Sequence, residues 1–339
     1  MTHDADLDAA TRDVVIERVL TQLHAHYVFP EAATRMEEAV RKHVRDGVYN
    51  AVPTEAALCT LLMAQLQEVS RDKHLRLIYS AEALPERDNA YEDPAWLEEE
   101  RQAGLLANFG LHCVERLPGN VGLLEHRGYF YDPAYAGDTL VAAMRLLAHT
   151  DALIIDLRHN RGGESAMVAL LCSLVLPATP IHLGDFYTRD TDTTEQSWTL
   201  PYLPISRYDT NPLFVLTSAR TFSAGEEVAY NLQSLKRATI VGETTRGGAH
   251  PREQYRITAH SELALPNARA INALTGTNWE GVGVTPDIAV PREAALRTAH
   301  RAALTEALAR REGSLMQTSK DLVEEARTAL GDREEVSGR

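Results

Sequence analysis

The stretch Leu213-Phe214-Val215-Leu216-Thr217, followed by Thr221-Phe222-Ser223-Ala224-Gly225, is the part of the sequence that best indicates the fold. The first five residues are aliphatic, aromatic or β-branched and predict a buried strand. After the turn, Val228 and Leu232 recur at helical spacing, so the sequence predicts a helix that opens at Ser223. A strand that leads directly into a helix is the repeating unit of an α/β fold.

The same alternation recurs around this stretch. Further short apolar runs predict strands, and amphipathic segments at about 138–149, 165–175 and 224–236 predict the helices between them. The predicted strands are Val121–Glu125, Ala152–Leu157 and Ala238–Gly242. Strands that alternate with helices favour a mainly parallel sheet covered by helices.

The rest of the chain divides by its pattern. We expect a helical N-terminal domain over 1–80, because Val15, Val19 and Leu23 recur every four residues. Residues 81–119 are the least patterned and are interpreted as a connector. The catalytic core is expected over 120–300, and a tail rich in Ala, Arg and Glu predicts helix over 301–339.

Composition narrows the class of protein. The chain has 339 residues, 34 Lys and Arg against 48 Asp and Glu, and a formal net charge of −14, which disfavours binding to nucleic acids or anionic membranes. Cys59, Cys113 and Cys172 are far apart, which fits free thiols in a reducing compartment. The acidic N-terminus lacks a signal-peptide pattern, so we expect a cytoplasmic protein.

Ser223 allows two interpretations. At the start of a helix its side chain lies near amide groups that lack intrahelical partners and can hold an oxyanion. Ser223 and Glu226 also fit a capping box, in which the hydroxyl only satisfies a helix amide. Caps are far commoner than nucleophiles, so this motif alone favours the cap.

Other segments carry polar groups next to glycine turns. Asp156-Leu157-Arg158-His159-Asn160-Arg161-Gly162-Gly163 ends a predicted strand on two glycines that can leave amides uncovered, and a similar turn runs from Gly242 to His250. Glu280 lies in Asn278-Trp279-Glu280-Gly281, and His74 follows the N-terminal helices in Asp72-Lys73-His74. Each of these alone is also compatible with an ordinary turn or a structural histidine.

In chain order, the segments 156–163, 223–227 and 241–250 together closely resemble the tail-specific (C-terminal-processing) serine peptidase family. Gly281-Val282-Gly283-Val284-Thr285-Pro286-Asp287 is similar to the closing motif of that family. The resemblance covers about residues 10–290. It implies an α/β fold with a crotonase/ClpP-like spiral core and an N-terminal helical domain.

Two departures indicate the branch. Relatives of the Ser/Lys type carry a lysine in the glycine turn where this chain has Arg246-Gly247-Gly248, and many insert a PDZ domain for which 75–120 is too short. The sequence therefore resembles the branch of the tricorn core protease and interphotoreceptor retinoid-binding protein. In tricorn a serine directly precedes the histidine, whereas this chain has Lys73, with Ser70 nearby as a substitute.

The resemblance implies a role for each residue. Ser223 is the expected nucleophile, His74 its base and Glu280 the group that supports the base. Amides of Gly162 or Gly163 and of Ala224 are expected to bind the oxyanion. Ser70, Lys73 and His250 are supporting candidates.

Two other functions are compatible with the same fold. One is a non-catalytic binding protein for an apolar small ligand, as in the retinoid-binding relatives, and the other is an acyl-CoA enzyme of the crotonase type. The combination of Ser223, His74 and Glu280 favours hydrolysis of a peptide or small acyl substrate. We expect no metal or cofactor, since the sequence has no His-Glu-x-x-His or Cys-x-x-Cys cluster. Self-association is left open.

Overall fold

The computed structural model describes residues 7–86, 93–311 and 316–336. The first six residues, on which the expected absence of a signal peptide partly depends, lie outside this range. So do 87–92 of the expected connector and 312–315 and 337–339 of the expected tail.

The chain forms two compact units, which we describe separately. The first contains the described residues of 1–100, 185–195 and 248–271, and the second those of 101–184, 196–247 and 272–339. This division differs from the consecutive ranges expected from the sequence, because segments from the second half of the chain complete a sheet near its beginning.

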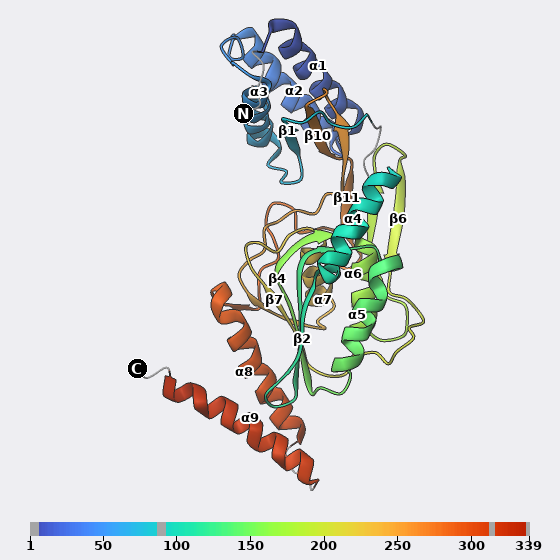
Figure 1. Ribbon diagram of the computed structural model, residues 1–339, viewed down its shortest axis with the longest axis vertical. Coiled ribbons are helices and arrows are strands. Elements are labelled where there is room, and N and C mark those ends of the chain that lie inside the picture. Colours follow the sequence, from blue (N-terminus) through green and yellow to red (C-terminus); the bar gives the residue numbers. More distant parts are fainter. Residues whose placement is uncertain (1–6, 87–92, 312–315, 337–339) are drawn as a thin grey trace. The chain divides into compact units, whose positions relative to one another are not determined.

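The first unit packs three helices on a small antiparallel sheet (Figure 1). Its helices and strands are α1 (Ala9–His26), α2 (Pro30–Arg45), α3 (Glu55–Ser70), β1 (Arg76–Tyr79), β9 (Arg252–Arg256) and β10 (Ser261–Pro266). The predicted stripe of Val15, Val19 and Leu23 is fully buried in its core. β10 pairs with β1 in the register Arg76↔Ala264, which brings 248–271 into this unit.

The second unit is built on a six-stranded sheet in the order β12-β8-β7-β4-β3-β2. The strands are β2 (Leu111–Leu117), β3 (Val121–Phe130), β4 (Ala152–Gly163), β7 (Leu213–Thr217), β8 (Thr239–Gly242) and β12 (Ile288–Ala289). The pairs β3–β4, β4–β7, β7–β8 and β8–β12 are parallel, and β2 is antiparallel to β3. The four predicted strands and the mainly parallel sheet are thus confirmed.

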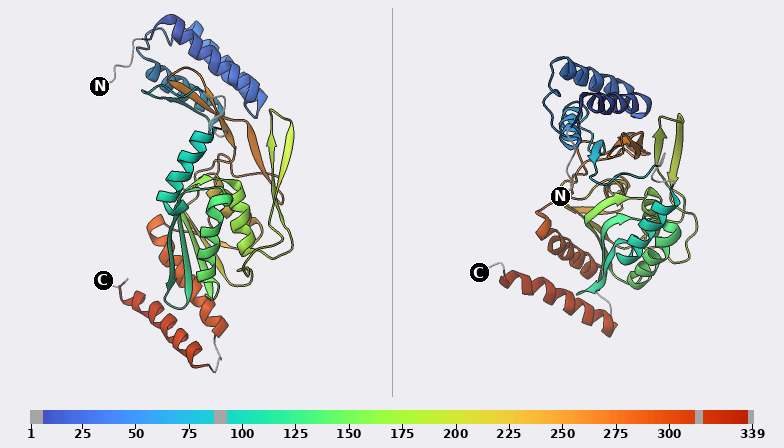
Figure 2. Two further views of the ribbon diagram at one scale, coloured as in Figure 1. Left: turned by 45° about the vertical axis from the view of Figure 1, so that its right-hand side comes forward. Right: turned by 45° about the horizontal axis from the view of Figure 1, so that its top comes forward.

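Helices cover both faces of this sheet (Figures 1 and 2). They are α5 (Pro133–Leu147), α6 (Ser165–Val175), α7 (Ala224–Ser234) and α8 (Arg292–Arg311), and α9 (Gln317–Val336) packs on α8. Ala295, Ala299 and Ala303 of α8 pack on alternate residues of the strands, such as Ile154 and Phe214. Small side chains let α8 lie close to the sheet, which buries the apolar face of this helix.

The remaining elements are short or lie between these. They are α4 (Pro94–Leu106), the 3₁₀ turn η2 (Asn108–Gly110), β5 (His182–Thr188), β6 (Thr193–Trp198) and β11 (Ala268–Asn272). β11, β5 and β6 form a three-stranded sheet in that order. The expected connector therefore contains a helix and a strand, and α8 begins nine residues before the expected tail at 301.

Two further features of the described residues concern the cysteines and the hydropathy of the helices. Cys59 and Cys172 are buried and Cys113 is half-buried, all three as free thiols. Burial raises the pKa of the Cys172 thiol. Among the helices of the described ranges, none has the length and apolar composition to cross a bilayer.

Candidate active site

The turn between β7 and α7 is fixed to the end of β4. The Thr221 hydroxyl donates to Leu157 O at 2.9 Å, and the Ser218 hydroxyl donates to Arg158 O at 2.7 Å. Ser218 N in turn donates to Thr221 Oγ1 at 3.0 Å. Because these groups are buried, the bonds hold the turn in one position over the neighbouring strand.

Ser223 has an unusual backbone conformation at the start of α7. Its φ is 53° and its ψ is −122°, a region that residues with a side chain rarely adopt. Such a conformation costs on the order of 1–3 kcal/mol and persists only when surrounding contacts enforce it. A simple helix cap has no need of it, since caps normally lie in the extended region. The backbone of Ser223 therefore favours the functional interpretation over the cap.

Glu226 is one of the contacts that enforce this conformation. Its side chain is fully buried, and Oε2 accepts from Ser223 N at 2.8 Å. Oε1 accepts from the Thr245 hydroxyl at 2.5 Å and from Gly247 N at 2.6 Å. One carboxylate thus joins the serine turn to the glycine turn that follows β8. The sequence indicated only the first of these bonds, because the capping pattern is local.

Of the paired glycines at the end of β4, Gly162 lies against Ser223 and Gly163 against Phe130 of β3. A Cβ on Gly162 would lie 2.7 Å from Ser223 Cβ, and a Cβ on Gly163 would lie 2.1 Å from Phe130 O. Both residues have positive φ, 110° and 115°. Only glycine fits at either position, because any side chain there would clash with Ser223 or the adjacent strand.

The two glycine amides differ in what they bind. Gly162 N donates to Asn160 Oδ1 at 2.9 Å, so it already has an acceptor. Glu164 N donates to Phe130 O at 2.9 Å, and Phe130 pairs with Gly163 in the parallel ladder. In such a ladder the Gly163 amide points away from β3, to the side on which β4 pairs with β7. Of the two expected oxyanion donors, the geometry favours Gly163.

The segment that carries Glu280 lies beside the same glycine turn. Gly281 N donates to Gly247 O at 3.4 Å, and a Cβ on Gly247 would lie 2.9 Å from Gly283 N. Glu280 is half-buried, and its amide donates to Asn278 Oδ1 at 3.0 Å. Glu280 therefore belongs to the same unit as Ser223 and to a segment in contact with the turn that Glu226 holds.

Two histidines of the first unit, His74 and His250, contact one buried carboxylate. Asp72 Oδ2 lies 2.8 Å from His250 Nδ1 and accepts from the Tyr27 hydroxyl at 3.1 Å. Asp72 Oδ1 accepts from His74 N at 3.0 Å. Burial opposes ionisation of Asp72, but the hydrogen bond and positive field of His250 and the His74 amide outweigh it and hold the pKa of this carboxyl below its usual value.

His74 itself is nearly buried. Burial lowers the pKa of His74 to about 3. The negative charge of Asp72 acts to raise this pKa, whereas Arg252 and His250 lower it further. The imidazole is therefore neutral at physiological pH, the protonation state in which one ring nitrogen is an acceptor.

The structure changes the roles expected of Ser70 and Lys73. Ser70 Oγ accepts from Asp72 N at 3.3 Å, so it shapes the turn that carries the aspartate. Lys73 and His74 lie in this turn, ahead of β1, and not in an extended segment. The αL conformation of Arg71, with φ 54°, ends α3 and starts the turn.

Ser223, Gly162, Gly163, Ala224 and Glu280 belong to the second unit, whereas His74, His250, Ser70 and Lys73 belong to the first. The structure groups the residues within each unit as described. The approach of His74 to Ser223 stays a prediction from the sequence. Asp72, Asn160 and His126 were not identified from the sequence as functional candidates. Asp72 and Asn160 nevertheless lie inside the quoted motifs.

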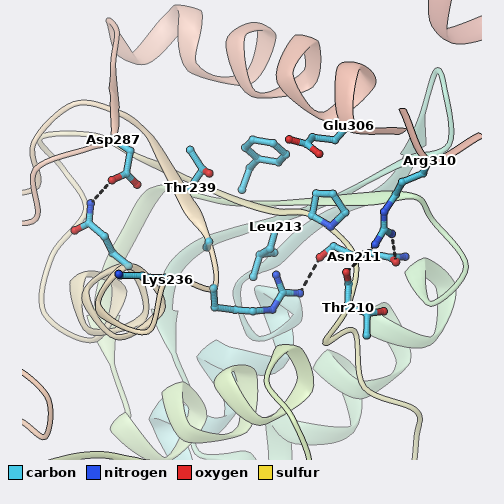
Figure 3. Close-up of a pocket in the computed structure, with 13 residues that line it drawn as sticks. Thr210, Asn211, Leu213, Lys236, Thr239, Asp287, Glu306 and Arg310 are labelled. Carbon is cyan, nitrogen blue, oxygen red and sulfur yellow. Dashed lines mark hydrogen bonds between the residues drawn. The ribbon is translucent and has the colours of Figure 1, made fainter. Parts of the chain in front are cut away.

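A cavity of about 550 Å³ in the second unit lies elsewhere (Figure 3). It opens at the amino end of β7, next to Leu213, whereas Ser223 follows the carboxyl end of that strand. Arg237 in its wall donates to Val175 O at 2.6 Å and Asn211 O at 3.0 Å, and Arg310 donates to Thr210 O at 2.9 Å. These cations hold loops together. Functional residues of parallel sheets gather at the carboxyl ends, so this cavity is not the candidate active site.

Two family models match the chain. Residues 128–290 match peptidase family S41, and residues 7–103 match the N-terminal domain of this family in eukaryotic IRBP. The first range contains Ser223, Gly162, Gly163 and Glu280, and the second contains His74. The described residues between β1 and β2 form α4 and η2.

Curated relatives of this chain are C-terminal-processing enzymes. It is 25% identical over 181 residues to the chloroplastic C-terminal processing peptidase of Tetradesmus obliquus, which covers 50% of this chain and 36% of that protein. It is 32% identical over 119 residues to the carboxyl-terminal-processing protease of Synechocystis sp., which covers 35% and 26%. The chain thus spans about a third or less of the length of the curated relatives it matches.

Solved structures show the same fold. One from Parabacteroides merdae is 18% identical with a TM-score of 0.61, covering 86% of this chain and 96% of that one. The tricorn protease is 13% identical with a TM-score of 0.55, covering 94% of this chain and 37% of that one. These likenesses confirm the α/β fold with an N-terminal helical region. With both family models matched in order along the sequence, the chain belongs to peptidase family S41.

Proposed function

We propose that the protein is a serine peptidase that cleaves peptide bonds through Ser223. The observation that carries this proposal is the strained backbone of Ser223 at the first turn of α7, enforced by Glu226 and packed against Gly162. This arrangement exposes a hydroxyl at a helix N-terminus beside a glycine loop, which is the geometry of a nucleophile and an oxyanion site. The family and its C-terminal-processing relatives support a peptide as the substrate.

His74 is proposed as the base. Its depressed pKa keeps the imidazole neutral, so it can take the proton of the Ser223 hydroxyl as the oxygen attacks the carbonyl carbon. The proton then passes to the leaving amine, and water hydrolyses the acyl-enzyme by the same route. The reaction requires the two units to bring His74 to Ser223.

The oxyanion is proposed to bind the amides of Gly163 and Ala224. At the start of α7 the amides of Gly225 and Glu226 donate to Phe222 O and Ser223 O, at 3.0 and 2.8 Å. Ala224, the first residue of the helix, supplies the donor closest to the nucleophile. The positive end of the helix dipole stabilises the same charge. Glu280 is proposed to support the imidazolium that forms.

The core is proposed to be of the crotonase/ClpP-like type. The parallel strand order β8-β7-β4-β3 with helices on both faces supports this assignment. A purely ligand-binding role is the weaker proposal, because binding an apolar molecule would not require a strained serine.

Labelling with a fluorophosphonate tests the nucleophile. Wild type should react at Ser223, while Ser223→Ala should lose both labelling and peptide hydrolysis. Ser165→Ala is the matched control, since Ser165 also stands at the start of a helix but has no strained backbone. Labelling of folded Ser223→Ala at the wild-type rate would refute the proposal.

A further inference from the structure

A line of three hydrogen bonds runs from the glycine loop into the core of the second unit. Gly162 N donates to Asn160 Oδ1 at 2.9 Å. Asn160 Nδ2 lies 3.0 Å from His126 Nδ1, and His126 Nε2 lies 3.2 Å from Phe109 O. Asn160 is 0% exposed and His126 5%, so water does not compete for these groups.

The two backbone groups at the ends fix the direction of every bond. Gly162 N–H can only donate, so the oxygen of the Asn160 amide faces it and the NH₂ faces His126. His126 Nδ1 must then accept, which leaves the ring proton on Nε2, where it is donated to Phe109 O. Only neutral His126 in this one tautomer satisfies the line. Burial lowers the pKa of His126 to about 4, in agreement with a neutral ring.

Packing holds both side chains in place. A Cβ on Gly225 would lie 2.4 Å from Asn160 Oδ1, so Asn160 fills the space that the first turn of α7 leaves open. A Cβ on Gly110 would lie 2.5 Å from His126 Cε1, and the Phe130 ring lies 4.4 Å from the imidazole, centroid to centroid. These close neighbours restrict the rotamers that both side chains can adopt.

We propose that Asn160, itself held by His126, is a positioning residue that binds the Gly162 amide and so presents the Gly163 amide to the oxyanion. Two consecutive amides in a glycine loop compete to face a developing charge. With Gly162 N bound to Asn160, the loop has one orientation, and the amide of Gly163, the residue after the one that contacts Ser223, points away from β3. This inference rests on the proposed peptidase function and adds the device that orients its oxyanion site.

A pair of His126 variants tests the line. In His126→Asn the amide oxygen can replace Nδ1 as the acceptor for Asn160, whereas His126→Leu fills the space but cannot accept. We expect kcat to fall about tenfold or more in His126→Leu with KM little changed, and to stay within about threefold of wild type in His126→Asn. Equal kcat values for the two folded variants would overturn the proposal, because a purely structural ring would not distinguish them.

A pair of asparagine variants tests the other end. Asn160→Asp replaces the NH₂ donor by a carboxylate oxygen opposite His126 Nδ1 and should lower kcat about 100-fold. Asn120→Asp is the matched control: Asn120 is also buried, but lies before β3 and donates to His149 O and Asp151. It should lower Tm and leave kcat near the wild-type value. An equal effect of both substitutions on kcat would refute a specific role for Asn160.

A ¹⁵N NMR measurement on the His126 ring decides the proposal even without activity. Wild type should show the neutral ring with its proton on Nε2 at pH 7, and Asn160→Ala should change the Nδ1 shift. A ring protonated on Nδ1 in wild type would refute the line of bonds, whatever the activity. Activity that depends on Ser223 but not on His126 or Asn160 would refute this inference alone, whereas loss of the Ser223 dependence would refute the proposed function.

Discussion

His250 in the first unit and His126 in the second are both buried, but their Nδ1 atoms meet different groups. His250 Nδ1 faces the Asp72 carboxylate, and His126 Nδ1 faces the NH₂ of Asn160. A carboxylate only accepts, so the hydrogen bond requires a proton on His250 Nδ1. An amide NH₂ only donates, so it requires a bare Nδ1 and a neutral ring.

The difference assigns different tasks to the two clusters. A carboxylate between two histidines can compensate a positive charge that arrives during a reaction, and Asp72 contacts both His250 and the His74 backbone. The Asn160–His126 line tolerates no change of protonation and fixes geometry instead. We therefore expect the first unit to handle protons and the second to hold the nucleophile and the oxyanion donors.

The largest expected effect comes from replacing His74, the proposed base, and is compared with the replacement of its charged neighbour Lys73. His74→Ala should lower kcat by roughly 10³-fold, because the base is lost, while Lys73→Met should keep most of the activity. Steady-state kinetics on a peptide substrate measures both variants. The reverse ranking, with both proteins folded, would assign the chain to the Ser/Lys type and contradict the assignment of proton transfer to His74.

A smaller effect is expected when the carboxylate is made into an amide. Asp72→Asn places an NH₂ among the donors Tyr27 Oη, His74 N and His250 Nδ1, and should lower the free energy of unfolding by about 3 kcal/mol. Urea denaturation measures this loss. Asp46→Asn, at an exposed aspartate paired with Lys42, is the control and should unfold like wild type. Wild-type stability of Asp72→Asn would show that the carboxylate is not needed there.

The smallest expected effect concerns pH. The pKa of His126 is lowered to about 4 in the folded protein, so between pH 6.5 and 4 the unfolded chain binds more protons and the folded state loses stability as the pH falls. The variant His126→Asn has no imidazole at this position and therefore lacks this pH-dependent loss of stability. Its stability relative to wild type should therefore rise by about 2 kcal/mol between pH 7.5 and 4.5, as measured by urea denaturation at each pH. A constant difference would show that His126 is as easily protonated when folded.

The sequence predicted what depends on neighbours along the chain. The runs at 121–125, 152–157, 213–217 and 238–242 are strands because their own residues are apolar and β-branched, and no distant segment is needed to recognise them. The cap between Ser223 N and Glu226 spans three residues and was equally visible. The glycine pair was visible as a turn because glycine is required for positive φ.

What the sequence did not reveal depends on pairs far apart. Glu262 faces Ile78 in the sheet of the first unit, and no period in either segment indicates that pairing. His126, the partner of Asn160, is 34 positions away in the sequence. It lies in β3, whose residue pattern does not distinguish it from other strands. The αL residue that ends α3 and the turn at Lys73 depend on the bonds of Ser70 and Asp72, which composition does not indicate.

The Glu226 carboxylate also has a consequence for motion. Since its two oxygens bind the Ser223 amide, the Thr245 hydroxyl and the Gly247 amide, the serine turn and the glycine turn after β8 cannot open one at a time without leaving a buried charge short of donors. Solvent therefore reaches the amide hydrogens of Ser223 and Gly247 through one shared opening event, and the two turns behave as a single cooperative element.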